Sequence, residues 1–258
     1  MGHVTAVVFD WAGTTVDHGS LAPVRTLEKL FAGRGMPVTE DEVRRDMGIH
    51  KKDHIRELLR MKRGAAPKES EVEDLFAAFV PMQMDCLIAY SAVIPGVTAV
   101  AKELRARGIK IGSTTGYTRR MLDVLLTLAA AEGYVPDCAL CPEDTIAGRP
   151  FPWMCYLAAT KMGTYPMHTM IKIGDTASDM QEGINAGMWT IGIARTGNML
   201  GLSADELAPL RPAAQKVLVN SARAKLCDAG AHYVADAVAD CLPVVEAIEQ
   251  RLEKGERP

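Results

Sequence analysis

The chain of 258 residues has no long hydrophobic run and no excess of charge of one sign. No stretch approaches the roughly 18 uninterrupted apolar residues of a transmembrane helix. Lys and Arg number 29 and Asp and Glu 32, which gives a formal net charge of −3. Nucleic-acid-binding proteins normally carry a basic stripe and a high pI, and this chain has neither. We therefore expect no nucleic-acid partner and no membrane partner.

The first residues also lack the pattern of a secretory leader. Residues 1–9 contain no basic segment followed by a long apolar run. With 48% hydrophobic and 24% charged residues, the composition is that of a globular protein able to bury a full core. We expect a cytoplasmic protein of one or two domains.

The six cysteines form neither a disulfide framework nor a metal-site pattern. Only Cys138 and Cys141 have C-x-x-C spacing, and no second pair or nearby histidine completes a zinc site. They stand in a short apolar segment that predicts a buried strand, where cysteines are usually small core residues. We assign no function to this pair, nor to the segment 203–230.

Short apolar, β-branched runs alternate with helical patterns along most of the chain. Strands are expected at 5–9, 109–113, 139–141, 170–173, 190–193 and 232–234. Helices are expected at 97–107, 119–131, 152–162 and 178–186, with others beginning near 203 and 242. This alternation predicts an α/β fold with a doubly wound parallel sheet, which binds ligands at the carboxyl ends of its strands.

The stretch from 21 to 92 breaks the alternation and predicts helices only. Thr39 with Glu42, and Ser70 with Glu73, match the capping-box pattern of two helix starts. Pro81 is expected to kink or interrupt the last helix. We therefore expect a core domain of residues 1–20 and 93–258 and an inserted all-helical domain of residues 21–92.

Polar residues stand directly after four of the expected strands. They are Asp10 after the first, Thr115 and Gly116 after the second, Arg149 after the third, and Asp175 with Asp179 after the fourth. In a doubly wound sheet these segments converge on one crevice. Taken singly, Asp10 has an ordinary explanation as a turn or cap residue, and Arg149 as a surface residue. Together they predict a carboxylate site suited to Mg²⁺ beside groups suited to a phosphoryl group.

Four such segments in this order resemble the motifs of the haloacid dehalogenase superfamily. The resemblance implies that Asp10 is a nucleophile that forms an aspartyl-phosphate, with Thr115 as the second-motif hydroxyl and Arg149 as the third-motif cation. It also implies a cap over the site, formed by the helical insert, and a magnesium ion held by Asp10, Ala12, Asp175 and Asp179.

One position departs from the commonest pattern of that superfamily. Its phosphatases usually carry a second aspartate two residues after the nucleophile, where this chain has Ala12. An alanine cannot protonate the alkoxide leaving group of a phosphate ester. The residues 47–54, expected to open a helical run, offer other chemistry, because they place Lys51 and His54 on one helix face. Spacing alone does not choose between Lys51 and Lys52 as a reactive amine.

The combination closely resembles the phosphonoacetaldehyde hydrolase family, also called phosphonatases. The matching strings are Phe-Asp-Trp-Ala-Gly-Thr-Thr at 9–15, Gly-Ser-Thr-Thr-Gly-Tyr-Thr-Arg at 112–119, Gly-Arg-Pro-Phe-Pro-Trp-Met at 148–154 and Gly-Asp-Thr at 174–176. The resemblance selects Lys51 as a Schiff-base lysine, assisted by Met47 and His54 with Tyr117 nearby. It implies that a small phosphonate substrate is cleaved to acetaldehyde and phosphate, with Mg²⁺ as cofactor and a homodimer formed through the cap.

Cleavage of a carbon–phosphorus bond pushes electrons onto carbon, and a protonated imine at Lys51 would accept them. This chemistry needs no general acid at position 12, which agrees with Ala12. Two other functions remain open: a Mg²⁺-dependent phosphomonoesterase, against which Ala12 argues, and a catalytically silent binding protein on the same fold. The silent protein would require the loss of a site group, whereas every expected group is present in the sequence.

Overall fold

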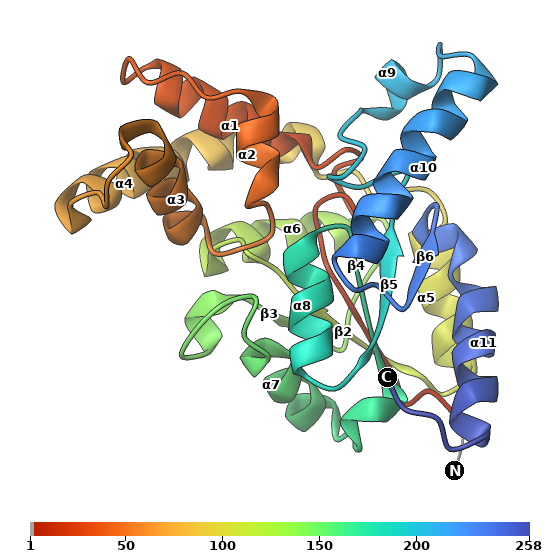
Figure 1. Cartoon of the computed structure of the whole chain (residues 1–258). Coiled ribbons are helices and arrows are strands. Elements are labelled where there is room, and N and C mark those ends of the chain that lie inside the picture. The colour runs from red at the N-terminus through yellow and green to blue at the C-terminus, as the bar shows by residue number, and fades with distance from the viewer. Residues whose placement is uncertain (1–2) are drawn as a thin grey trace.

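A six-stranded parallel sheet forms the centre of the molecule (Figure 1). This computed structural model describes residues 3–258, so residues 1 and 2 of the expected core domain lie outside the described residues. The strands are β1 (Ala6–Phe9), β2 (Lys110–Thr114), β3 (Cys138–Leu140), β4 (Met170–Gly174), β5 (Trp189–Ile193) and β6 (Tyr233–Ala235). Their order is β3-β2-β1-β4-β5-β6, and each neighbouring pair is parallel. The expected doubly wound α/β fold is confirmed.

Helices cover both faces of this sheet. They are α5 (Val97–Ala106), α6 (Arg119–Ala131), α7 (Trp153–Met162), α8 (Ala177–Asn185), α9 (Ala204–Leu207), α10 (Pro212–Asp228) and α11 (Leu242–Glu253). Val7 and Phe9 of β1 belong to the core cluster that includes α5, α6 and α11, whereas Ala6 and Val8 point to the opposite face and pack with α7. Because both faces are covered, the central strands β1, β2 and β4 are buried almost along their whole length, including the polar residues Ser113, Thr114 and Lys172.

Four helices connect β1 to α5. They are α1 (Leu21–Ala32), α2 (Glu40–Arg45), α3 (Lys51–Arg63) and α4 (Glu69–Leu87). Figure 1 shows them grouped to one side of the sheet, and α4 packs against both α1 and α3. The helix-only prediction for this stretch is confirmed, as is the capping box of Thr39 and Glu42 at the start of α2. Within residues 3–258, no helix is long and apolar enough to cross a membrane.

The capping box predicted for Ser70 and Glu73 is wrong. An N-cap at Ser70 would start the helix at Glu71, but α4 begins two residues earlier, at Glu69, and no side chain caps it. The carboxylate of Glu69 accepts hydrogen bonds from Arg56 and lies 3.1 Å from the amine of Lys52, both on α3. These ion pairs and the favourable position of an acidic residue in the first turn of a helix draw Glu69 into α4.

Two further local predictions fail in the same region. Of the two effects expected of Pro81, an interruption is wrong, because α4 continues through it to Leu87 with Phe79 and Gln83 fully buried on either side, whereas a kink stays a prediction. The helical run expected to open at Met47 begins only at Lys51. The four residues before it form a loop in which Gly48 has a φ of +92°, a conformation that glycine adopts without strain.

The register of the sheet brings the ends of its central strands to one level. Phe9 of β1 pairs with Ser113 of β2 and with Ile173 of β4. The residues that follow therefore leave the sheet side by side, and Asp10 is the first of them on β1. This carboxyl edge, at the point where the strand order reverses, is where ligands bind in doubly wound sheets.

Candidate active site

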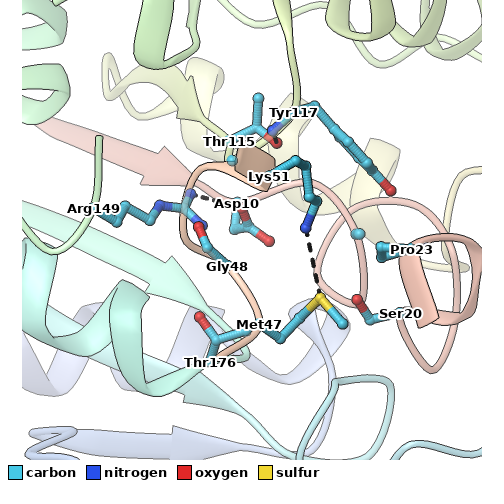
Figure 2. A pocket seen from close by; sticks show the side chains of 12 residues that line it. Asp10, Ser20, Pro23, Met47, Gly48, Lys51, Thr115, Tyr117, Arg149 and Thr176 are labelled. Carbon is cyan, nitrogen blue, oxygen red and sulfur yellow. Dashed lines mark hydrogen bonds and ion pairs between the residues drawn. The ribbon is translucent and has the colours of Figure 1, made fainter. Parts of the chain in front are cut away.

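A small pocket lies at the carboxyl edge of the sheet (Figure 2). It is lined by Asp10, Ala12, Ser20, Pro23, Met47, Gly48, Lys51, Thr115, Gly116, Tyr117, Arg149 and Thr176. The volume open to a water-sized molecule is about 20 Å³, which is room for one water or slightly more. Most of the residues expected in the site thus line one cavity, while Asp175, Asp179 and His54 lie outside its lining.

Asp10 and Arg149 form the centre of the site. The guanidinium of Arg149 donates a hydrogen bond to Asp10 Oδ1 at 2.6 Å, and both side chains are buried. The same nitrogen donates to the carbonyl oxygen of Thr114 at 2.6 Å. One carboxylate oxygen of Asp10 is thereby fixed, and the other faces the pocket from the end of β1. A buried, oriented carboxylate beside a guanidinium suits attack on a phosphoryl group whose oxygens the arginine also attracts.

Two more carboxylates stand beside Asp10. Ligand oxygens of Asp10, Asp175 and Asp179 all lie within 4.8 Å of one another. Asp175 accepts hydrogen bonds from the hydroxyl of Thr14 at 3.1 Å and from the backbone N–H of Asn198 at 2.7 Å. Three buried carboxylates at this spacing repel one another unless a cation balances them, and hard oxygen ligands suit a divalent metal. The donor set therefore fits a divalent metal site.

The pKa values of these acids reflect the crowding. Burial raises the pKa of Asp10, and the charge of Asp179 raises it further against the opposing effect of Arg149. Burial, followed by the charges of Asp10 and Asp179, raises the pKa of Asp175 well above its ordinary value. For Asp179 burial also opposes ionisation, but Arg149 and Lys172 outweigh it and lower the pKa. The buried cations thus outweigh burial at Asp179 but not at Asp10 or Asp175.

Two buried charged residues of the site were not identified from the sequence. Lys172 on β4 places its amine 3.0 Å from Asp179 Oδ1 and 3.3 Å from Glu182 Oε2. The same oxygen of Glu182 accepts a hydrogen bond from Arg149 Nε at 2.9 Å. A signal was present, because Lys172 interrupts an otherwise apolar strand and Glu182 lies one helical turn after Asp179. Together they hold the guanidinium of Arg149 in place from behind.

The loops after β1 and β2 supply the neutral part of the lining. The hydroxyl oxygen of Thr115 accepts a hydrogen bond from the backbone N–H of Tyr117 at 3.2 Å. Gly116 touches the loop before α3 so closely that an added Cβ would lie 2.5 Å from the carbonyl oxygen of Ile49. Ala12 adds only a methyl group and its backbone. The absence of a side chain at Gly116 lets the loop before α3 approach the sheet.

Lys51, the first residue of α3, projects into the pocket from the side opposite Arg149 (Figure 2). Its amine donates to the sulfur of Met47 at 3.7 Å and lies 5.6 Å from the centre of the Tyr117 ring. The side chain is 3% exposed, and burial lowers the pKa of the amine to about 8 against the attraction of Asp10. A share of the amine is therefore neutral, and nucleophilic, near neutral pH.

The neighbouring lysine points away from this cavity. The amine of Lys52 pairs with the carboxylates of Glu69 and Glu73 on the outside of α3 and α4. These partners raise the pKa of Lys52, Glu73 having the larger effect. Only Lys51 of the two therefore combines burial, access to the pocket and a lowered pKa, a choice that spacing alone left open.

Tyr117 and His54 occupy different places relative to the amine. Tyr117 lines the pocket, and burial raises the pKa of its hydroxyl well above the ordinary value, so it remains protonated. His54 lies one turn after Lys51 on α3, and its Nε2 is 2.9 Å from the carbonyl oxygen of Val43. Burial, followed by the charge of Lys51, lowers the pKa of His54 to about 3. Its ring is therefore neutral, and within residues 3–258 its Nδ1 has no hydrogen-bond partner.

The cysteine pair lies apart from the pocket lining. Cys138 is on β3 and Cys141 follows it, and all six cysteines are free. Burial raises the pKa of Cys138 to about 11 and that of Cys141 to about 12. Thiols with raised pKa values are poor nucleophiles and poor metal ligands at neutral pH. The pair serves as part of the sheet and its edge.

Comparison with known proteins agrees with this geometry. Residues 4–187 match the haloacid dehalogenase-like hydrolases. The chain is 44% identical to a phosphonoacetaldehyde hydrolase of Nitratidesulfovibrio vulgaris over 266 residues, which covers 100% of this chain and 95% of the relative. It is also 44% identical to a phosphonoacetaldehyde hydrolase of Bacillus cereus, with 96% of this chain and 97% of the relative covered.

A solved structure gives the same result. The phosphonoacetaldehyde hydrolase-like protein of Oleispira antarctica superposes with a TM-score of 0.95 at 38% identity, covering 100% of this chain and 96% of that one. The β-phosphoglucomutase of Clostridium difficile, at 15% identity and a TM-score of 0.73, shares the fold. This chain belongs to the haloacid dehalogenase-like hydrolases and, within them, to the phosphonoacetaldehyde hydrolase family.

Proposed function

We propose that this protein hydrolyses phosphonoacetaldehyde to acetaldehyde and phosphate by cleaving its carbon–phosphorus bond. One observation carries the proposal: the buried amine of Lys51 and the buried carboxylate of Asp10 face the same small pocket. Hydrolysis of a phosphate ester has no need of an amine, whereas cleavage of a bond from phosphorus to carbon needs an electron sink. The names of the curated relatives support this choice of substrate.

The first stage joins the substrate to the helical part of the molecule. The neutral amine of Lys51 attacks the aldehyde carbon, and loss of one water gives a protonated imine. The lowered pKa of Lys51 supplies the neutral amine. The sulfur of Met47, 3.7 Å away, aims the amine without forming an ion pair with it. We assign Tyr117 to the wall that shields the imine from water.

The second stage breaks the bond to phosphorus. A carboxylate oxygen of Asp10 attacks phosphorus opposite the departing carbon, so an O–P bond forms as the C–P bond breaks. The electron pair of the C–P bond moves into the imine and leaves an enamine on Lys51. Arg149 attracts the phosphoryl oxygens during this transfer, while the hydroxyl of Thr115 and the backbone N–H of Gly116 donate to them.

Two waters complete the cycle. Protonation of the enamine carbon regenerates an imine, and one water hydrolyses it to acetaldehyde and free Lys51. The other water hydrolyses the aspartyl-phosphate at Asp10 and releases phosphate. Since imine formation released one water, the net reaction consumes one. We assign His54 to proton transfer around Lys51, with its neutral ring acting through Nδ1.

The proposed metal is Mg²⁺, because every available donor is a hard oxygen. It would be held by the carboxylates of Asp10, Asp175 and Asp179 and by the backbone carbonyl of Ala12. When bound, it supplies positive charge that offsets the charge of the phosphoryl group. Loss of activity with a chelator and recovery with Mg²⁺, but not with Ca²⁺, is the expected result.

We propose that residues 21–92 form a cap domain over a core of residues 1–20 and 93–258. The pocket has only about 20 Å³ open to a water-sized molecule, too little for the substrate, so substrate binding requires the cap to move. Ser20 and Gly96 have φ values of +52° and +91°, and we assign the hinges to Ser20 and residues 94–96. A cytoplasmic homodimer formed through the cap completes the proposal, and light scattering of the purified protein tests the dimer.

Borohydride trapping followed by mass spectrometry of the Lys51 peptide tests the function. Protein, Mg²⁺ and phosphonoacetaldehyde are mixed before reduction, and the expected product carries an ethyl group on Lys51. Lys52, on the outside of α3, is the internal control and is expected to remain unmodified. A phosphonoethyl group on Lys51 would mean that the amine reacts while the Asp10 half of the site does not. An unmodified Lys51 in folded protein contradicts the proposal and favours a phosphomonoesterase.

A further inference from the structure

We propose that Arg44 is a positioning residue that clasps helix α2 to the core and thereby holds the pocket closed. Arg44 lies near the end of α2, outside the pocket lining, and takes no part in the mechanism above. Its side chain is nevertheless only 11% exposed. For a cation on a short surface helix, such burial indicates specific partners rather than a solvated position.

Those partners belong to two loops of the sheet-bearing part of the chain. The guanidinium donates to the carbonyl oxygen of Gly19 at 2.8 Å, to Oδ1 of Asn198 at 3.0 Å and to the carbonyl oxygen of Gly201 at 2.8 Å. We call these three residues the carbonyl seat. The side chain of Asn198 donates back to the carbonyl oxygen of Arg44 at 3.0 Å. The Nε of Arg44 donates to the carboxylate of Glu40 at 2.7 Å. Each part of the planar guanidinium is thus bound.

The seat is shaped for a guanidinium. Its two loops are bonded to each other, because the N–H of Gly19 donates to the carbonyl oxygen of Thr196 at 2.7 Å. At Gly201 an added Cβ would lie 2.7 Å from Arg44 Nε. A side chain at that position would therefore collide with the bound arginine, and the absence of one opens the space that Arg44 fills.

The clasp connects to the active site on both sides. The backbone N–H of Asn198 donates to Asp175 Oδ2 at 2.7 Å, and Ser20, which lines the pocket, follows the seat residue Gly19 in the chain. On the other side, Arg44 precedes the loop that leads to Lys51. Docking of Arg44 therefore sets the loop carrying Lys51 against the loop supporting Asp175. Release of Arg44 would let the two halves of the site separate.

Amide hydrogen exchange on metal-free, substrate-free protein tests the clasp. Arg44→Gln is compared with Arg45→Gln, a matched control whose side chain is 54% exposed and pairs with the adjacent Asp46. In the Arg44 variant we expect exchange in 17–22 and 196–202 to accelerate at least tenfold, with the sheet amides unchanged. Equal exchange in the two variants overturns the proposal. Asn198→Ala, which keeps the N–H bound to Asp175, is expected to give the same acceleration and serves if Arg44→Gln does not fold.

A kinetic measurement adds a second readout and, unlike the exchange, rests on the proposed function. Loss of hydrogen bonds to a charged group corresponds to roughly a ten- to hundredfold rise in KM for phosphonoacetaldehyde when closure accompanies binding. Arg44→Lys keeps the charge but not the fork, and we expect an intermediate KM. An unchanged KM in Arg44→Gln contradicts the clasp. Failure of the wild-type protein to cleave phosphonoacetaldehyde would instead refute the proposed function and leave the exchange result standing.

Discussion

Asp10 and Lys51 face one pocket from different parts of the chain, so single changes can separate their two half-reactions. Asp10→Asn keeps the size of the side chain but removes the nucleophilic charge. We expect it to reduce phosphate release by at least about 10⁴-fold, since the covalent route is lost. Imine formation at Lys51 should persist, so borohydride should trap a phosphonoethyl group on the lysine. Phosphate release at the wild-type rate would remove Asp10 from the mechanism.

The buried amine of Lys51 also makes stability depend on pH. Its folded-state pKa of about 8 lies below the unfolded value of about 10.4. The unfolded chain therefore binds the proton more tightly, so burial of the charged amine lowers the free energy of unfolding. This destabilisation is fully present below pH 8 and disappears as the pH rises past 10.4. At pH 7 we expect the free energy of unfolding of Lys51→Met to be about 3 kcal/mol larger than that of the wild type.

Urea unfolding at pH 7 and at pH 10.5 checks this stability difference, which should nearly vanish at the higher pH. Lys52→Met is the matched control, because its amine forms only outer ion pairs with Glu69 and Glu73. Such pairs contribute about 1 kcal/mol or less, so the control should be slightly destabilised or unchanged. If Lys51→Met is less stable than the wild type at pH 7, the lowered pKa of Lys51 is contradicted.

At the scale of elements, the loop before α3 depends on one close backbone approach. Gly116, after β2, leaves no room for a Cβ, which would lie 2.5 Å from the carbonyl oxygen of Ile49. Gly116→Ala should push this loop outward, carry Lys51 away from Asp10 and lower kcat/KM by roughly 100-fold, as a misplacement of about 1 Å does. Steady-state measurement of kcat/KM for Gly116→Ala and for the wild type checks this prediction.

The control for that change is Gly33→Ala. Gly33 has a φ of −63°, and an added Cβ would meet its nearest atom at 3.4 Å, an ordinary contact. We expect wild-type kinetics from this variant. If Gly116→Ala also retains full kcat/KM, the close approach of loop and sheet is not needed for the reaction.

The sequence predicted the sheet well because parallel strands buried on both faces are continuous apolar runs. The residues after those strands, such as Asp10 and Thr115, could be predicted to meet because the edge of a doubly wound sheet collects them. The start of α4 could not be predicted, since Glu69 is drawn into the helix by ion pairs with another helix. Lys172 was overlooked although it interrupts an apolar strand, because its partners Asp179 and Glu182 lie on the following helix and only the tertiary structure brings them to its amine.

The loop at 47–50 shows the same limit. Its residues fit a helical pattern, but the positive φ of Gly48 and the hydrogen bond from Ser178 Oγ to the carbonyl oxygen of Met47 hold it open. That bond joins residues 131 positions apart. Local periodicity carries no information about such a partner, so the correct start of α3 at Lys51 needed the tertiary structure.

Across the whole molecule, the carboxyl edge of the sheet carries unbalanced buried charge. The four carboxylates of Asp10, Asp175, Asp179 and Glu182 outnumber the buried cations Arg149, Lys172 and Lys51, and a divalent cation would offset the excess negative charge. Because burial raises the pKa of Asp175, metal-free protein should lose stability as the pH rises above the ordinary carboxyl range.

This imbalance predicts how metal affects unfolding. At pH 7 without metal, Asp175→Asn should be more stable than the wild type, because a neutral amide replaces a buried, poorly compensated carboxylate. Mg²⁺ at 100 times its Kd should stabilise the wild type by about 2.7 kcal/mol and the variant far less. Thermal unfolding of the wild type and of Asp175→Asn, each with chelator and with Mg²⁺, measures the stability difference without metal and the stabilisation by Mg²⁺. A wild type indifferent to chelation would exclude a metal at these carboxylates.

The methyl group of Ala12 has a consequence for the other phosphate compounds that surround the enzyme in a cell. A cell holds many phosphate monoesters at high concentration, and a phosphoryl-transfer site open to all of them would drain intermediates of central metabolism. With no acid at position 12 to protonate an alkoxide leaving group, we expect the Asp10 side of the site to leave those esters largely intact. Under the proposed mechanism, only a molecule that first condenses with Lys51 completes the reaction, so the enzyme could be abundant without depleting the phosphate esters around it.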